Sequence, residues 1–168
     1  DLRVSFDTPN GMVQAVRGID LDVSPGETVG VVGESGSGKS VTFLGIMGLL
    51  GRNAAITGSA MLGDTQLIGA KNKVLRSVRG KRVAMIFQDP LSALNPVYRI
   101  GDQIVEMLQS HSEITSKAGA KRAIELLEMV GIPQPSRRVD QYPHEFSGGM
   151  RQRVMIAMAM ANDPDVLI

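Results

Sequence analysis

The pattern of hydrophobic and polar residues predicts that the chain begins with short strands. Residues 2–6 and 19–23 alternate apolar with polar side chains, the period of a half-buried strand, and residues 8–11 form a turn between them. Residues 28–32 are β-branched or glycine throughout, so we expect a buried, parallel strand there. A second apolar run at residues 83–87 predicts another buried strand.

Helical spacing takes over in the second half of the chain. A helix near residue 100 is expected to present one apolar face, formed by Ile100, Ile104, Val105 and Leu108. A second helix, capped by Ser116, should bury a stripe of Ala120, Ala123, Ile124, Leu127 and Val130. A third helix is expected from about residue 149 to residue 161, and residues 165–168 look like the beginning of a buried strand.

The order of these elements predicts an α/β fold. Between the first buried strand and the second lie a glycine-rich loop, a helix over residues 39–50, and turn-rich alternation at residues 51–69 that is typical of β-hairpins. The helical block of residues 89–161 then interrupts the sheet, because another strand follows it. No internal repeat or low-complexity segment is present.

Composition narrows the classes of partner and chemistry. The 168 residues suffice for one core, and the net charge of +1 is too small to favour nucleic acid, so we expect no nucleic-acid partner. The sequence has no Cys, which removes disulfides, thiolate metal sites and cysteine nucleophiles. No run approaches the roughly 18 apolar residues of a membrane span. Any membrane role would therefore be exercised from the aqueous side through a partner.

One glycine-rich segment carries specific chemistry. It fits the pattern G-x-x-x-x-G-K-[ST], and with the next residue the expected binding set is Gly33, Glu34, Ser35, Gly36, Ser37, Gly38, Lys39, Ser40 and Val41. Glycines let backbone N–H groups approach phosphate oxygens, and the following helix contributes its positive end. Lys39 can reach the β- and γ-phosphates, and the Ser40 hydroxyl can ligate Mg²⁺. The motif by itself predicts a nucleoside triphosphate, so a kinase or a GTPase remains open at this point.

A second glycine pair lies at the start of the third helix. Ser147, Gly148 and Gly149 could be a simple helix cap with two flexible residues. Arg151 and Arg153 follow in the first turns, where the helix dipole disfavours cations. A helix start that is Ser-capped, glycine-rich and cationic would suit an incoming anion.

Three segments together resemble the ATP-binding domains of ABC transporters. Residues 146–153 resemble the signature L-S-G-G-Q-x-Q-R, with Phe146 for Leu and Met150 for the first Gln. Residues 83–90 resemble the Q-loop strand, and residues 163–168 resemble the strand leading into Walker B. More narrowly, the chain resembles the oligopeptide, dipeptide and nickel importer ATPases over its whole length, most specifically at residues 88–98 and 142–157.

This resemblance implies a particular architecture. The expected fold is a P-loop NTPase core of the ABC ATPase type, with an antiparallel β subdomain and an inserted helical subdomain. Residues 1–168 would be a partial ABC domain whose C-terminal part is absent. Within it, residues 1–88 would form the β-rich and P-loop core, residues 89–161 the helical subdomain, and residues 162–168 the start of the Walker B strand.

The resemblance also assigns roles to residues. Lys39 and Gln88 would be the catalytic residues, and Ser40 and Gln88 would hold Mg²⁺. The ATP of one subunit would be closed over by three residues of a second ABC ATPase subunit, identical or different: Ser147, Gly148 and Gly149. Family members stack adenine on an aromatic ring, and since residues 8–11 offer none, Phe6 is the candidate, with a simple core role as the alternative.

The implied function is ATP hydrolysis coupled to uptake of oligopeptides or dipeptides. The alternatives are uptake of nickel or another solute, or a soluble ABC ATPase outside transport. The resemblance implies membrane permease subunits as partners, an extracytoplasmic solute-binding protein indirectly, and a peripheral place on the cytoplasmic face. Residues 91–98, with Leu94 and Tyr98, would contact the permease or merely connect two elements. The family's catalytic carboxylate and switch histidine lie beyond Ile168, so residues 1–168 alone are expected to bind ATP without hydrolysing it.

Overall fold

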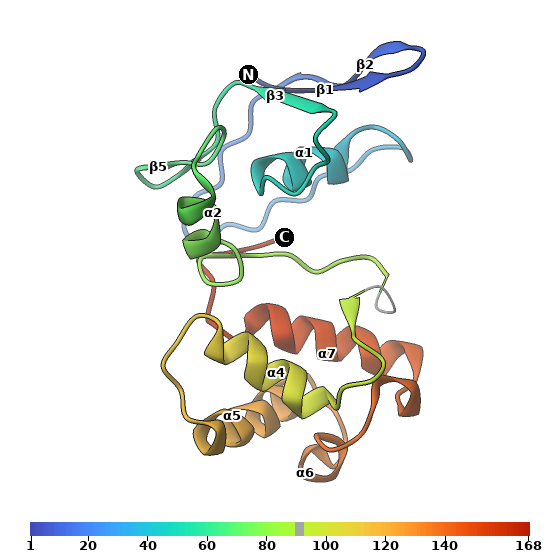
Figure 1. Cartoon of the computed structure of the whole chain (residues 1–168), viewed down its shortest axis with the longest axis vertical. Helices are drawn as coiled ribbons and strands as arrows, with labels where there is room; N and C mark the ends of the chain where they lie inside the picture. The colour runs from blue at the N-terminus through green and yellow to red at the C-terminus, as the bar shows by residue number, and fades with distance from the viewer. Residues whose placement is uncertain (90–92) are drawn as a thin grey trace. The chain divides into compact units, whose positions relative to one another are not determined.

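A computed structural model describes residues 1–89 and 93–168, which form two compact units. The first unit is Asp1–Arg76 and the second is Ser77–Ile168. Figure 1 shows strands and helices in both units.

The first unit is built on a three-stranded antiparallel sheet in the order β2-β1-β3. Strand β1 (Leu2–Thr8) and β2 (Gly11–Ile19) form a hairpin that the pair Thr8–Gly11 closes over a two-residue loop. Gly11 adopts a φ of 108°, which glycine tolerates without strain. Strand β3 (Ala54–Thr57) pairs with the other edge of β1.

The position of the second strand corrects the sequence prediction. Alternation suggested residues 19–23, but β2 ends at Ile19 and the residues that follow it are not a strand. A two-residue hairpin loop brings the chain back immediately, so the residues directly after the turn become the hydrogen-bonded partners of β1. Hairpin geometry therefore outweighs the local pattern. The predicted turn at residues 8–11 is confirmed.

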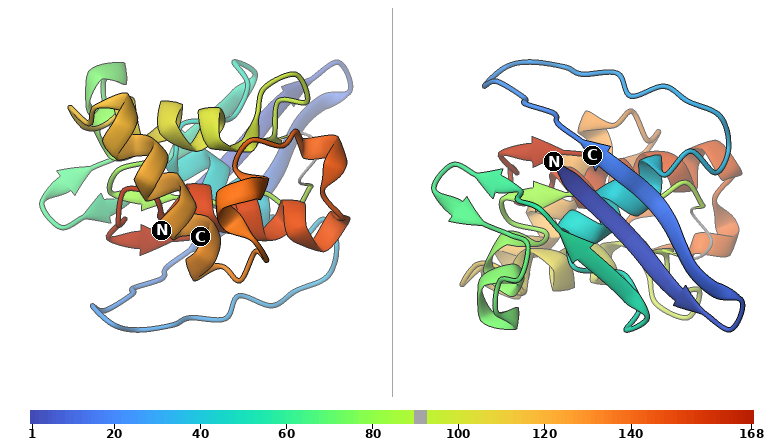
Figure 2. Two further views of the ribbon diagram at one scale, coloured as in Figure 1. Left: turned by 90° about the horizontal axis from the view of Figure 1, so that it is seen from below. Right: turned by 90° about the horizontal axis from the view of Figure 1, so that it is seen from above.

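Helix α1 (Lys39–Ile46) packs against one face of this sheet. The right-hand view of Figure 2 shows the strands lying over α1. Gly45 lies at this contact, where a Cβ would be at an ordinary packing distance, 3.5 Å, from side-chain atoms of Val4 and Ile56. The helix ends earlier than the predicted residue 50, because Gly48 adopts a φ of 61° that stops it.

The predicted buried strand at residues 28–32 is not observed. These residues have no strand assignment, and Val32 is 95% exposed. An inner parallel strand depends on hydrogen-bonding neighbours and apolar cover on both faces. Within residues 1–89 and 93–168, no strand pairs with this segment. Its apolar composition is therefore insufficient to make it a strand here.

The remainder of the first unit contains short elements. Strand β4 (Met61–Leu62) and β5 (Thr65–Gln66) form a small hairpin. Together with β3 they confirm the β character predicted for residues 51–69. Helix α2 (Asn72–Val78) was not predicted, because its seven residues are too few to display a helical period.

The second unit contains a short parallel pair of strands. Strand β6 (Val83–Ala84) pairs with β7 (Val166–Leu167), and the Ile86 amide donates to the Ile168 carbonyl at 2.8 Å. The predicted strand at residues 83–87 is thus correct in place but only two residues long. Phe87 is exposed rather than buried.

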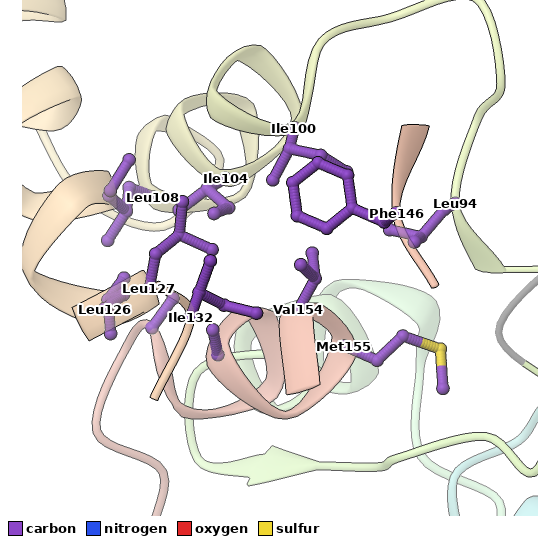
Figure 3. Close-up of a cluster of buried hydrophobic side chains, with 13 residues drawn as sticks. Leu94, Ile100, Ile104, Leu108, Leu126, Leu127, Ile132, Phe146, Val154 and Met155 are labelled. Carbon is purple, nitrogen blue, oxygen red and sulfur yellow. The ribbon is translucent and has the colours of Figure 1, made fainter. Parts of the chain in front are cut away.

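Helices form the core of the second unit. They are α4 (Ile100–Gln109), α5 (Ser116–Met129), α6 (Pro135–Arg138) and α7 (Gly148–Met160), with a 3₁₀ turn η1 (Pro143–Glu145) before α7. Their buried side chains form one cluster, in which Figure 3 shows Phe146 beside Ile100. The predicted face of α4 is confirmed for Ile100, Ile104 and Leu108, which are all buried, while Val105 is partly buried.

Helix α5 differs from its prediction in two details. Thr115, not Ser116, is the N-cap, and its hydroxyl accepts from the Ala118 amide at 3.3 Å. The buried face is rotated as well: Ala120 is exposed, whereas Leu126 is fully buried. Leu126 and Leu127 are adjacent in sequence, so a helix that contacts both α4 and α7 can bury both.

Candidate functional site

The glycine-rich loop lies directly before α1. Gly36 and Gly38 adopt left-handed φ values of 82° and 91°, so the turn of the loop depends on glycine. Position 38 also has no room for a side chain, because a Cβ would lie 2.7 Å from the Ala15 carbonyl oxygen on β2. The sheet thus supports the base of the loop and requires glycine at this position.

The Lys39 ammonium is folded back onto this loop. It donates to the carbonyl oxygens of Gly33 at 2.7 Å and Glu34 at 2.8 Å, and to the Ser37 hydroxyl at 3.1 Å. All three acceptors belong to the loop itself. A cation is therefore held at the loop, where it can exchange neutral acceptors for an anionic oxygen.

The start of α1 suits phosphate. Gly38 is the N-cap and offers no side-chain acceptor to the first amides, and the first turn contains no acidic residue. Amides at a helix start and the helix dipole both favour an anion. Ser40 is exposed and supplies a hydroxyl, while Val41 follows it, half-buried, in the helix. The amides and the ammonium suit phosphate oxygens, and the hydroxyl oxygen of Ser40 could ligate Mg²⁺.

Phe6 is half-buried on β1, on the sheet face that covers α1. Val4 and Phe6 are two residues apart and therefore share a face, and Val4 is 1% exposed beneath α1. Phe6 pairs with Val13 of β2 and Ala54 of β3. Phe6 thus lies on the side of the sheet that packs on α1, and it is partly buried there.

The start of α7 has an open helix terminus. Ser147 is the N-cap, and its hydroxyl accepts from the Met150 amide at 3.3 Å. Gly148 and Gly149 are exposed, and no heavy atom lies within 4 Å of where their Cβ atoms would be. The first turn of α7 has no acidic residue. Its amides are thus available to an anionic ligand.

The two arginines after these glycines have structural partners. Arg151 donates through Nε to the Pro143 carbonyl at 2.8 Å, and Arg153 donates to the Gly131 carbonyl at 2.9 Å. These hydrogen bonds to neutral carbonyl oxygens fix both guanidinium groups and leave their positive charge near the helix start. The features that would suit an anion here are thus the open amides and two positioned cations.

Gln88 is exposed in the bend after β6, in the second unit. The structure thus brings residues 33–41 together in the first unit and Ser147, Gly148 and Gly149 together in the second, where Gln88 also lies. Leu91 lies outside the described residues. Leu94 is buried at 4% exposure and belongs to the core, so its expected place on a contact surface is wrong.

The segment before the signature is held by polar contacts that the sequence did not reveal. The Glu145 carboxylate accepts from the Tyr142 amide at 2.7 Å. Arg99 lies 3.5 Å from Asp140, and its hydrogen bond to the Tyr142 side chain raises the pKa of the guanidinium above its usual value. Capping of Tyr142 by a Glu three residues later is a detectable signal. The Arg99 contacts follow from tertiary packing alone.

Other classes of site find no support in the described residues. Within residues 1–89 and 93–168, no group of three His, Cys, Asp or Glu side chains could hold a metal ion. No helix in that part of the chain has both the length and the apolar character to cross a membrane. The glycine-rich loop and the start of α7 are therefore the candidate ligand-binding sites.

Comparison with known proteins shows the family of this chain. The sequence model of the ABC transporter family matches residues 16–168. The chain belongs to this family. The ABC fold is also seen in solved structures: the dimeric ATP-binding cassette MJ0796, bound to ADP and Pi in a post-hydrolysis state, has a TM-score of 0.82 and 23% identity. That match covers 99% of this chain and 72% of the cassette.

Relatives within the ABC family are peptide transport proteins. The oligopeptide transport ATP-binding protein OppD of Bacillus subtilis is 51% identical, over 100% of this chain and 48% of the relative. The dipeptide transport ATP-binding protein DppD of the same organism is 50% identical, over 100% and 51%. OppD of Escherichia coli is 45% identical, over 100% and 50%. The chain therefore spans about half the length of these relatives.

Proposed function

We propose that the chain is the nucleotide-binding part of an ABC importer subunit that couples ATP hydrolysis to uptake of oligopeptides or dipeptides. The observation that carries this proposal is the 50–51% identity to OppD and DppD of Bacillus subtilis along the whole chain. Those names describe the relatives. The geometry of the glycine-rich loop supports the nucleotide-binding part of this proposal.

In the proposed nucleotide site, residues 33–41 bind the triphosphate. Lys39 leaves its loop acceptors and neutralises charge on the β- and γ-phosphates. Ser40 and Gln88 would hold Mg²⁺, which would offset the charge of the phosphates. Phe6 would provide the apolar surface for adenine, since it is partly buried on the sheet face that packs on α1. Gln88 would also orient the attacking water.

The signature segment acts on the nucleotide of a second ABC subunit. Ser147, Gly148 and Gly149 present a hydroxyl and open amides at a helix start, ligands that suit a γ-phosphate. We propose a dimer of two identical or two related subunits, each supplying this segment to the other's ATP. The solved cassette with the same fold is a dimer, which supports the proposal that two subunits associate.

The loop between Leu94 and Ile100 is the proposed contact with a membrane permease. It presents two apolar side chains to solvent, Val97 at 72% exposure and Tyr98 at 55%. Binding residues are often carried on loops that a rigid scaffold positions, and these two adjacent apolar side chains are available for such a contact. The protein would then lie on the cytoplasmic face of the membrane, and a solute-binding protein outside would act on it through the permease.

The proposal is tested by uptake in cells. A strain that lacks the gene for the full-length protein is assayed for uptake of labelled dipeptides, labelled oligopeptides and nickel, with and without the restored gene. Peptide uptake that depends on the gene, and co-purification with a permease, are expected. Dependence of nickel uptake alone would contradict the peptide substrate, and absence of any permease would contradict the importer.

A further inference from the structure

The loop that carries Val97 and Tyr98 is held by a side chain that the proposed function does not use. Gln103 lies on α4 between Ile100 and Ile104, both fully buried, and is itself only 7% exposed. A buried primary amide must find partners for both its oxygen and its nitrogen, because an unsatisfied polar group in the interior is costly. The partners of Gln103 therefore indicate what it does.

Among the described residues, the partners of the Gln103 side chain belong to that loop. Its Oε1 accepts from the Asn95 amide at 2.9 Å. Its Nε2 donates to the Asn95 carbonyl at 3.0 Å and to the Tyr98 carbonyl at 3.0 Å. One amide thus binds the backbone at both ends of the turn that displays Val97.

The loop has further local order around this amide. The Asn95 side-chain oxygen accepts from the Val97 amide at 3.2 Å, and the Tyr98 amide donates to the Asn95 carbonyl at 3.4 Å. Leu94 before the loop and Ile100 after it are buried in the same core cluster. Val97 and Tyr98 are therefore exposed in a fixed conformation, and a preformed surface pays less ordering entropy when it binds.

We propose that Gln103 is a positioning residue for permease docking, because it fixes the conformation in which Val97 and Tyr98 meet the permease. The inference rests on the proposed function of that loop. In addition, the conformation of the docking surface is fixed by the side-chain amide of Gln103, which is buried in the helical core. Because Gln103 is buried and its amide binds the loop backbone, its loss should reduce coupling and leave ATP binding unchanged.

The test compares Gln103→Met with Gln109→Met in the full-length protein assembled with its permease. Gln109 is a matched control, since it lies on the same helix but is exposed and donates over longer distances, 3.3 Å to the Ile114 carbonyl and 3.4 Å to Ser116. Hydrogen exchange of residues 93–99, peptide uptake per ATP hydrolysed, and ATP affinity are measured for both variants. ATP affinity is included because a variant that was destabilised as a whole would also bind ATP more weakly.

We expect Gln103→Met to speed amide exchange of residues 93–99 by about tenfold or more, the effect of losing a bond of about 1.4 kcal/mol. Uptake per ATP should fall at least about threefold, with ATP affinity unchanged and Gln109→Met close to wild type. Unchanged exchange, unchanged uptake per ATP, or an equal effect of Gln109→Met would each overturn the inference.

Two further variants keep the outcome interpretable. Should Gln103→Met fail to fold, Asn95→Ala loosens the same loop at an exposed position by removing the acceptor of the Val97 amide. Unchanged uptake per ATP in Asn95→Ala would then overturn the inference. The double variant Val97→Ala, Tyr98→Ala tests the docking surface itself. If it reduces uptake while Gln103→Met does not, the inference alone fails; if it transports normally, the proposed permease contact fails with it.

Discussion

Lys39 is the residue on which nucleotide affinity should depend most directly. Its ammonium is already held at the glycine-rich loop by three acceptors, so it needs little rearrangement to meet phosphate. Lys39→Ala should weaken ATP binding by about 1.5–3 kcal/mol, or about 10- to 150-fold in Kd, measured by calorimetry. Lys73→Ala, which removes the same charge from exposed α2, is the control. Equal affinity of Lys39→Ala and wild type would refute the phosphate site.

Alanine substitutions of Gly36 and Gly38 distinguish the cost of backbone strain from the cost of a steric clash. Both adopt left-handed φ values, so alanine should cost about 1–2 kcal/mol of unfolding free energy at either position. At position 38 the new Cβ would also meet the Ala15 carbonyl at 2.7 Å, whereas position 36 is open. Gly38→Ala should therefore destabilise by at least about 1 kcal/mol more than Gly36→Ala, measured by urea unfolding. Similar losses of unfolding free energy in the two variants would show that β2 does not exclude a side chain at position 38.

At the scale of elements, the start of α5 is decided by Thr115. Its hydroxyl satisfies the Ala118 amide, so Thr115→Ala should lower the free energy of unfolding by about 1 kcal/mol. Ser116 is the first helical residue rather than the cap, and Ser116→Ala should change stability by less than about 0.5 kcal/mol. Thermal unfolding of the two variants under identical conditions measures the difference. A larger loss of unfolding free energy for Ser116→Ala would show that Ser116 is the N-cap, as the sequence suggested.

At the scale of the whole molecule, Ser147 is expected to act on a partner's nucleotide. Ser147→Arg places a large cation at the exposed start of α7, so it should block dimer closure on ATP while monomeric protein binds ATP normally. Loss of the cap bond costs about 1 kcal/mol, so the measurements belong well below the melting temperature. Light scattering reports ATP-driven dimers, and calorimetry reports monomer affinity. Weakened binding by the folded monomer would contradict action on the partner.

A protein made of residues 1–168 should bind ATP without turning it over. Its carboxylates at the start of β7 are already engaged, Asp163 lying 3.7 Å from Arg122 and Asp165 2.8 Å from Arg82. By resemblance to ABC ATPases, the catalytic carboxylate is expected after residue 168. ATP should raise the melting temperature, because it binds only the folded state. Steady phosphate release that Lys39→Ala abolishes would overturn this prediction.

The sequence alone determined features that depend on neighbouring residues. The phosphate loop before α1 and the Ser147 cap of α7 each occupy only a few consecutive positions, so spacing and residue type suffice to find them. The buried face of α4 follows from helical periodicity, with Ile100 and Ile104 one turn apart. Such signals persist in a single sequence because their geometry is set within one or two turns of the chain.

Tertiary structure decided features whose partners are distant along the chain. The apolar residues 28–32 are not a strand, because strand formation requires a pairing neighbour that composition does not supply. The Arg153 guanidinium, placed by sequence at the start of α7, donates to the Gly131 carbonyl just beyond the end of α5. Gln103 lies between the buried Ile100 and Ile104, and its amide binds the backbone of the loop before α4. In each case the outcome depends on which backbone groups folding brings within hydrogen-bond reach, and local pattern does not encode those distances.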